Sequence, residues 1–422
     1  MTESCNSRGF SWLMKSCFPN PQEIRHGNTI AIRASEQSSS DNRDHRSQSH
    51  QTSFSSLPDD LLLECLSRVS LCSLPSASLV CRRWSQLLDS SDFYDLRRSH
   101  GHLYRTLFAV AFTDFGVYAA SHRMDTDREW KTTLLPAVEV VAPETFDGSF
   151  SHARLMAIER RIYILGRNAM IRYDAWTGTV TPRLPMIFPR KKFAAASVAG
   201  KIYVSGGASR TSAVEEYDPE SNSWCVVAES PRRRYGCIGA AVDGVFYSIG
   251  GLKIGGPHVE TTRGVGTEAH VYASTMDLYD VESKAWLRSR AVPGGGCVVA
   301  ACAAGGHIFV LASHAVELSF WRYDGRRKSG GFGEWCRVKS PPLPAQVRLD
   351  STVRFSCVGV GDKVLLVQVL GSIDDLLRRS RRSCRGMKEG LVLVYDNEAG
   401  EWSRGVYLPE VMRRAACVCV EC

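Results

Sequence analysis

Cysteine and histidine spacings raise the question of a metal site. Cys419 and Cys422 form a C-x-x-C pair, which is half of a zinc site, but no second Cys or His pair with zinc spacing accompanies it. Cys417 and Cys419 alternate within an apolar, strand-like run, so we expect both side chains to pack in a core. His307 and His314 flank one strand-like run, and no partner ligand stands near them. We therefore expect no metal.

Nucleotide-binding and hydrolase motifs would be a second source of chemistry. The sequence contains no G-x-S-x-G, H-E-x-x-H or G-x-x-x-x-G-K-[ST] segment. The doublets Gly206-Gly207 and Gly250-Gly251 recur at equivalent places of a repeat, so no dinucleotide fingerprint is needed to explain them. We expect neither a cofactor nor a catalytic residue.

A third group is the arginine-rich segment 378–385, whose arginines are Arg378, Arg379, Arg381, Arg382 and Arg385. Its composition fits a nuclear-import or nucleic-acid patch, and it equally fits a solvated loop. No aromatic residues interleave with these arginines, so we do not expect a nucleic-acid partner. The net charge of +8 is spread over 422 residues and does not by itself predict one.

The composition is that of an ordinary globular protein, with 44% apolar and 23% charged residues. The longest apolar run, Cys297 to Ala304, is far shorter than the roughly 20 residues of a membrane-spanning helix, so we expect no membrane partner. There are 15 cysteines and no convincing signal peptide, which favours reduced thiols. We expect the protein in the cytoplasm, the nucleus or both.

Two segments precede the repeats. Residues 1–55 are rich in Ser, Asn, Gln and Arg and have little to bury, so we expect a disordered Ser-rich arm. Residues 56–100 have helical spacing, with a start signal at Ser56 and Asp59. The apolar face of the first helix is predicted at Leu61, Leu62, Cys65, Leu66 and Val69. A second helix, from Ser73, is predicted to carry Leu79, Val80, Trp84, Leu87 and Leu88.

After about residue 103 the apolar period becomes two, and a repeat appears. Its marker is a Tyr-Asp pair, preceded by two strand-like runs and followed in most copies by a tryptophan. The pairs stand at Tyr173, Tyr217, Tyr279, Tyr323 and Tyr395, and the following tryptophans are Trp224, Trp286, Trp335 and Trp402. Four short strands per unit of about 45 residues are typical of a propeller blade.

Counting the outer aromatic position, with Trp130 in the first unit and Val180 in the second, gives six blades over residues 103–422. The first unit lacks an innermost strand, and the chain ends in an unfinished strand at 415–421. We expect this last strand to complete the first blade, because closing the ring removes free sheet edges.

Two sets of motifs resemble known modules. Leu57-Pro58-Asp59-Asp60-Leu61 and Val80-Cys81-Arg82-Arg83-Trp84 are similar to an F-box, and the Gly-Gly, Tyr-Asp and Trp repeats are similar to kelch motifs. Together they resemble the plant F-box/kelch-repeat family over residues 57–422. Gly166-Arg167, Ala312-Ser313 and Leu370-Gly371 depart from the double glycine, which weakens the exact blade boundaries.

The resemblance implies a non-catalytic substrate receptor of an SCF-type (Skp–cullin–F-box) ubiquitin ligase. The F-box would dock on the Skp-type adaptor, and through it reach the cullin and the RING protein, while the propeller would bind an unknown target protein. The residues matching F-box adaptor positions are Leu57, Pro58, Leu61, Leu66, Val80 and Trp84. A simple helix core is the alternative role for each of them.

The blade loops predict where the target would bind. The largest inserts, about 252–274 and 371–389, both fall between the second and third strands of a blade, and such loops share one face. Two basic clusters fall on the same face, namely Arg190, Lys191 and Lys192, and Arg232, Arg233 and Arg234. They predict an acidic or phosphorylated target segment. Solvated loops, or structural arginines at Arg190 and Arg232, are the alternatives.

Two other functions stay open from the sequence alone. One is a kelch scaffold that binds a partner without delivering it to ubiquitin, and such a scaffold has no need of the F-box motifs. The other is a kelch enzyme with an unrecognised site, which would require inward-pointing His, Tyr or acidic residues at the propeller axis.

Overall fold

The computed structural model describes residues 57–113, 115–135, 150, 152–253, 273–314, 317–326, 333–343, 353–371 and 390–422. The expected arm at 1–55, the arginine-rich segment 378–385 and most of the two large inserts lie outside the described residues. In the described part of the chain, no helix is both long and apolar enough to cross a membrane.

Four short α-helices form the N-terminal unit: α2 (Asp59–Ser67), α3 (Leu74–Ser78), α4 (Arg82–Asp89) and α5 (Ser91–Ser99), with a 3-10 turn at Leu71–Ser73. Asp59 and Asp60 lie in the first turn of α2, where their charge favours the positive end of the helix dipole. Arg97 in α5 is buried and donates to the Ser67 and Val69 carbonyls, at 3.0 and 2.8 Å. This arginine ties α5 to the end of α2.

Two predictions for the helical unit were wrong. The helix expected from Ser73 is interrupted between α3 and α4, where Leu79, Val80 and Cys81 leave the helical path. The buried face of α2 is formed by Leu62, Leu63 and Leu66, whereas Leu61 and Cys65 are exposed. The reason is that α2 packs on α4 and α5 from one side only, so half of the wide apolar stripe remains outside.

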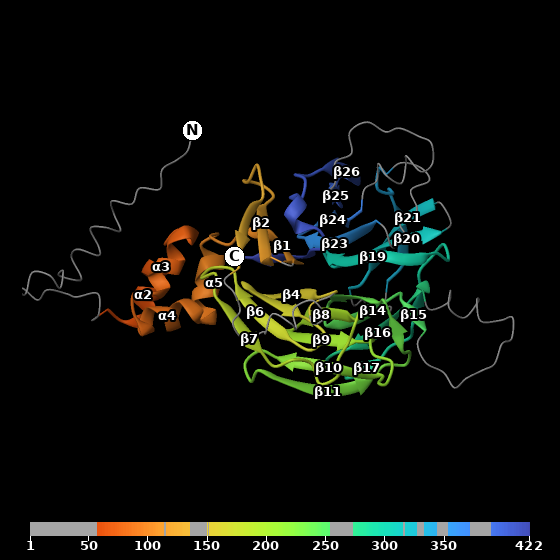
Figure 1. Ribbon diagram of the computed structural model, residues 1–422, viewed down its shortest axis with the longest axis horizontal. Helices are drawn as coiled ribbons and strands as arrows, with labels where there is room; N and C mark the ends of the chain where they lie inside the picture. The colour runs from red at the N-terminus through yellow and green to blue at the C-terminus, as the bar shows by residue number, and fades with distance from the viewer. Residues whose placement is uncertain are drawn as a thin grey trace, which may run out of the picture.

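Six four-stranded antiparallel sheets form a propeller beside this unit (Figure 1). The first blade contains β27 (Ala416–Glu421), β1 (Arg105–Thr113), β2 (Gly116–Arg123) and β3 (Lys131–Leu134). The second contains β4 (Arg154–Ile158), β5 (Arg161–Leu165), β6 (Met170–Asp174) and β7 (Val180–Arg183). The third contains β8 (Ala194–Val198), β9 (Lys201–Ser205), β10 (Ala213–Asp218) and β11 (Ser223–Glu229).

The remaining blades follow the same order from the axis outward. The fourth contains β13 (Ile238–Val242), β14 (Val245–Ile249), β16 (Thr275–Asp280) and β17 (Ala285–Trp286), with β18 (Arg290–Ala291) beside β16. The fifth contains β19 (Cys297–Ala304), β20 (His307–His314), β21 (Glu317–Asp324) and β22 (Trp335–Val338). The sixth contains β23 (Arg354–Val360), β24 (Lys363–Leu370), β25 (Val392–Asp396) and β26 (Glu401–Arg404). A short ladder joins β12 (Arg234–Tyr235) to β15 (Leu252–Lys253).

The last strand of the chain closes the ring. β27 is antiparallel to β1, with Arg105 opposite Glu421 and Val110 opposite Ala416. The innermost strands then follow one another around the axis as β27, β4, β8, β13, β19 and β23, each touching the next. A Cβ atom at Gly359 would collide with the carbonyl oxygen of Ala303, so this glycine is needed where β23 meets β19.

The Tyr-Asp and Trp markers have distinct structural roles. The tyrosine is buried against the tryptophan of the neighbouring outer strand, as in Tyr217 and Trp224, whose ring centroids are 5.0 Å apart. The aspartate accepts backbone N–H groups in the following turn, as Asp218 does from Glu220 at 2.9 Å. The tryptophan N–H reaches the preceding blade, as Trp224 does at the Leu184 carbonyl, 2.8 Å away. The tyrosine and aspartate therefore stabilise each blade internally, and the tryptophan also joins the blade to the preceding one.

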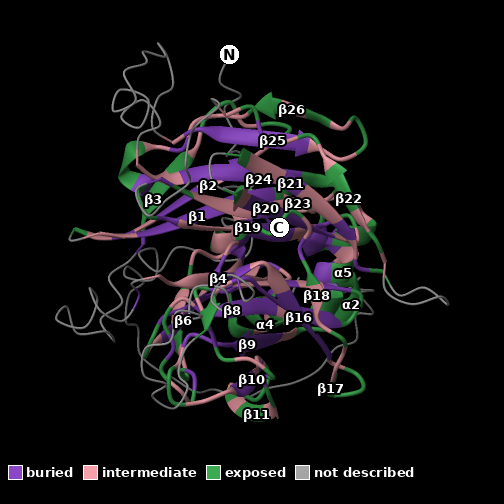
Figure 2. Cartoon of the chain, turned by 90° about the vertical axis from the view of Figure 1, so that its right-hand side faces the viewer, coloured by how far each residue is buried: buried purple, intermediate pink, exposed green. Residues whose placement is uncertain are grey.

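Burial is greatest in the middle strands of the blades. Middle strands such as β24 are mostly buried, innermost strands such as β4 and β27 are mostly half-buried, and outer strands such as β11 and β26 are largely exposed (Figure 2).

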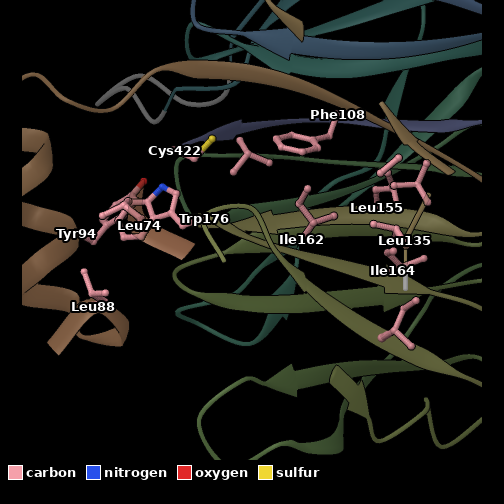
Figure 3. Packing of buried hydrophobic residues seen from close by; sticks show 14 of the residues in the cluster. Leu74, Leu88, Tyr94, Phe108, Leu135, Leu155, Ile162, Ile164, Trp176 and Cys422 are labelled. Carbon is pink, nitrogen blue, oxygen red and sulfur yellow. The ribbon is translucent and has the colours of Figure 1, made fainter. Parts of the chain in front are cut away.

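The helical unit and the propeller share one hydrophobic core. Trp176, in the turn between β6 and β7, is 3% exposed and contacts Phe93 and Tyr94 of α5, with ring centroids 5.3 and 6.0 Å apart. Figure 3 shows Trp176 beside Tyr94 at the boundary between the helices and the strands. Arg160 lies 4.5 Å above the Trp176 ring. The two units are therefore packed into one body.

Candidate functional site

The first candidate site is an apolar surface at the start of α2 and at the break before α4. Pro58 is exposed, Leu61 is 49% exposed and Leu79 is 85% exposed. Arg83 of α4 donates to the Asp59 carboxylate at 2.7 Å and also to the Leu57 carbonyl. These contacts hold the start of α2 against the start of α4. The backbone that carries these exposed apolar side chains is therefore held in place by the Arg83 contacts.

The structure separates the six sequence-predicted adaptor residues into three groups. Pro58 and Leu61 are exposed, and Leu57, Val80 and Trp84 are half-buried. Leu66 is only 3% exposed and lies in the shared hydrophobic core, so its assignment to a contact surface is corrected: it is a core residue. Sequence reasoning missed Leu79 as a surface residue, because the apolar spacing continues through the point where the helix stops.

The second candidate site is the propeller face at the N-terminal ends of the innermost strands. Two of its sequence-predicted contact residues are corrected, since Arg190 and Arg234 are each 1% exposed. Arg190 donates to Glu215 at 2.8 Å and to the Gly206 carbonyl at 2.8 Å. Because a charge is buried only when it is paired and hydrogen-bonded, this arginine is structural.

Arg234 has the same role one blade later. It donates to Asp277 at 2.8 Å and to the Gly250 carbonyl at 2.8 Å. Arg232 is half-buried and also pairs with Asp277. The structural-arginine alternative therefore holds at Arg190, whereas in the second cluster the fully buried arginine is Arg234 and not the expected Arg232, which is half-buried and engaged within its own blade.

Three of the predicted basic residues remain accessible on this face. Lys191 and Arg233 are exposed, and Lys192 is half-buried with its ammonium 5.5 Å from the Tyr235 ring. The structure thus brings Lys191 and Lys192 to the surface beside a buried Arg190, and Arg233 beside a buried Arg234.

The propeller axis encloses a channel of about 1590 Å³. It is lined by the innermost strands and carries many small side chains, among them Ala195, Ala300 and Ala416. Cys302 and Cys357 also line it, from neighbouring blades, with sulfurs 3.1 Å apart. Burial raises the pKa of Cys417 and of Cys419 to about 12, which keeps these thiols protonated. In the part of the chain that the structure describes, no group of three or more His, Cys, Asp or Glu residues could hold a metal ion.

Comparison with known proteins agrees with this architecture. The F-box domain model matches residues 54–96, and the Kelch motif model matches residues 189–231. An F-box/kelch-repeat protein of Arabidopsis thaliana is 59% identical over 427 residues, covering 100% of both chains. The chain belongs to the F-box/kelch-repeat family. A second Arabidopsis F-box/kelch-repeat protein is 29% identical over 242 residues, covering 56% of this chain and 61% of that protein.

Among solved structures, one titled "Structure of YjhT" matches with a TM-score of 0.44 and 16% identity, covering 62% of this chain and 84% of that chain. The family assignment gives the two candidate sites their partners in general terms. The F-box implies a Skp-type adaptor, and the kelch propeller indicates a protein target. F-box/kelch-repeat proteins are generally substrate adaptors.

Proposed function

We propose that this F-box/kelch protein is the substrate-recognition subunit of an SCF-type ubiquitin ligase. Its F-box docks on the Skp-type adaptor, which connects it to the cullin and the RING protein. Its propeller binds the target protein for ubiquitination and proteasomal degradation. The protein performs no covalent step itself, and it acts by raising the local concentration of target lysines near a ubiquitin-charged enzyme.

The observation that carries the proposal is the exposed apolar surface of the F-box. Leu79 is 85% exposed, although Leu62, Leu63 and Leu66 of the same helical unit are buried. Burying such a leucine fully against a partner contributes about 1.5–3 kcal/mol. Pro58 and Leu61 add to the same apolar surface. We expect these side chains to insert into an apolar groove of the adaptor.

The position of the F-box on the propeller supports simultaneous binding of adaptor and target. The F-box contacts the Arg160 turn, the Trp176 turn and the C-terminal Glu421 carbonyl, all at one face of the propeller. The N-terminal ends of the innermost strands, where the basic residues gather, open at the opposite face. A target bound there would leave the F-box surface free.

The test is co-purification of the full chain with a plant Skp-type adaptor. Leu61→Glu/Leu79→Glu places charge in the proposed contact, so we expect adaptor recovery to fall at least about tenfold, since about 1.4 kcal/mol is a factor of ten. The matched control is Leu184→Glu/Ile187→Glu, two propeller residues that are 54% and 49% exposed. The control should bind the adaptor as the wild type does, with an unchanged melting temperature.

Two outcomes would contradict the proposal. A wild-type chain that does not bind the adaptor would remove the link to the ligase and leave the scaffold function. Equal adaptor recovery from both double variants would show that Leu61 and Leu79 are not the contact.

A further inference from the structure

Four cationic side chains and one histidine surround one mouth of the axial channel. They are His152, Arg154, Lys192, Arg354 and Arg414. Arg154 and Arg354 are the first residues of β4 and β23, and Lys192 and Arg414 shortly precede β8 and β27. The innermost strands of a propeller run in the same direction along the axis, so these residues meet at one end.

Within the residues that the structure describes, no carboxylate neutralises this mouth. Among the described residues that line the channel there is no aspartate or glutamate, and none of the four cations forms an ion pair with a described residue. Arg154 donates only to main-chain carbonyls, those of Phe193 at 2.9 Å and Cys237 at 3.1 Å. Buried Arg190 and Arg234, by contrast, each have a carboxylate partner. As far as the structure describes the chain, the four cations at the mouth therefore have no carboxylate counter-ion, whereas Arg190 and Arg234 do.

The electrostatics of His152 report how closely these cations gather. Burial, together with the charges of Arg354, Lys192, Lys191 and Arg154, lowers the pKa of His152 to about 4. The pKa of Arg354 is likewise lowered by burial and by the neighbouring Arg414. A concave site in which like charges repel one another gains stability from a bound anion.

The channel behind the mouth indicates how an anionic ligand would lie. Small residues such as Ala195 and Ala416 leave room beyond the cations. At the opposite end, the turns after the innermost strands carry Glu159, Asp243 and Asp362. An extended anionic segment that enters at the cationic mouth therefore has room along the axis behind it.

We propose that the cationic mouth binds a phosphoryl group carried by an extended segment of the target protein. Arg354 and Arg414 are exposed and present guanidinium forks, which match the oxygens of a phosphoryl group in a bidentate arrangement. A phosphoryl group carries close to two negative charges at neutral pH, more than a single carboxylate brings to the same four cations. The inference rests on the proposed function, because the ligand is a segment of the target.

The test uses a peptide mixture with one fixed phosphoserine between randomised positions, and the same mixture with serine. Full-length protein bound to its adaptor should retain the phosphorylated mixture at least about tenfold better, and inorganic pyrophosphate should compete. Arg354→Glu/Arg414→Glu should abolish this preference. The matched control is Arg210→Glu/Arg404→Glu, which makes the same charge change at two exposed residues that lie outside the channel and belong to neither candidate site.

The control pair should keep the phosphopeptide preference within about twofold, because its side chains do not line the channel and salt screens exposed charges. An equal loss in both pairs would overturn the proposal, since only the general charge of the face would then matter. Pyrophosphate binding without any phosphopeptide preference would overturn it too, in favour of a free small anion.

The melting temperature and adaptor binding of each variant are measured on the same protein preparations. Arg354→Gln/Arg414→Gln, which removes charge without reversing it, should lower the preference while the melting temperature stays unchanged. If the wild-type chain binds the adaptor but shows no preference for the phosphorylated peptides, only the phosphoryl site is refuted. Failure of the wild-type chain to bind the adaptor refutes the ligase function, whatever the peptides do.

Discussion

Adjacent arginines in this chain differ completely in their surroundings. Arg234 donates to Asp277 and to two backbone carbonyls from a position that is 1% exposed, whereas Arg233 is exposed. Arg234 and Asp277 lie 43 residues apart in the sequence. The local sequence shows a run of three arginines, and only the fold decides which of them meets a distant carboxylate.

This difference predicts the effect of single substitutions. Arg234→Ala removes the fully buried partner of Asp277 and the hydrogen bond to the Gly250 carbonyl, while Arg232 still pairs with Asp277, so it should lower the free energy of unfolding by about 1–3 kcal/mol. Arg233→Ala should change it by no more than about 0.5 kcal/mol. Urea denaturation of both variants is the measurement. Similar small effects for the two would show that the Arg234 pair contributes little to the fold.

A second residue-scale prediction concerns pH. The pKa of His152 is lowered from 6.5 to about 4, so the folded state disfavours the protonated ring. The stability linked to His152 is therefore complete above pH 6.5 and is lost as the pH falls through the window from 6.5 to about 4. His152→Gln should flatten this part of the stability curve without changing stability at pH 8. Identical pH curves for variant and wild type would contradict the assignment.

At the scale of elements, Trp176 explains a departure from the repeat. Val180 occupies the outer aromatic position of the second blade, and it pairs with Tyr173 where other blades have a tryptophan. Trp176 instead lies in the turn before β7 and packs on α5. Asp89 at the end of α4 adds ion pairs to Arg160 and Arg161 of the same blade. Burial opposes ionisation of Asp89, but Arg161 and Arg160 outweigh it, and its pKa is lowered.

Removing the Trp176 side chain should loosen the F-box from the propeller. Trp176→Ala creates a cavity in the shared core, with an expected cost of about 3–5 kcal/mol. Hydrogen exchange should increase in α5 and in the turn between β6 and β7. Trp286→Ala, in the outer strand of the fourth blade, is the matched control and should leave exchange in α5 unchanged. Equal exchange in α5 for both variants would argue against rigid docking.

The sequence predicts elements well where each one carries its own marker. The Tyr-Asp pair recurs in blades two to six and the tryptophan in all of these except the second, so the strands and their order follow from local residues. The break between α3 and α4 has no such marker, because Leu79 and Val80 continue the apolar spacing of a helix. The cationic mouth was equally hidden, since His152, Arg354 and Arg414 are isolated in the sequence and meet only when the ring closes.

At the scale of the whole molecule, closure depends on a strand from the far end of the chain. β27 pairs with β1 along its length, and Trp130 of the first blade donates to the Val406 carbonyl beyond the sixth, at 3.1 Å. The same closure brings Cys422 and Val420 into the core shared with the F-box. Blade one, blade six and the F-box are thus joined at one seam.

Deleting residues 415–422 should open this seam. The first blade would lose its innermost strand and the ring would gain two free edges, so we expect a large drop in the melting temperature and a loss of cooperativity. A synthetic peptide of residues 414–422 added in trans should restore part of the stability. A truncated protein with an unchanged melting temperature would show that β27 does not close the ring.

The joined seam places the two candidate sites on one rigid body, at opposite faces. The account as a whole therefore claims that proteins held by the propeller are delivered to ubiquitin through the F-box. The most direct test is the ubiquitin occupancy of propeller-captured proteins in cells with the proteasome inhibited, for wild type and Leu61→Glu/Leu79→Glu. We predict the same captured proteins in both and their ubiquitination with the wild type only. Equal ubiquitination with both forms would contradict the account.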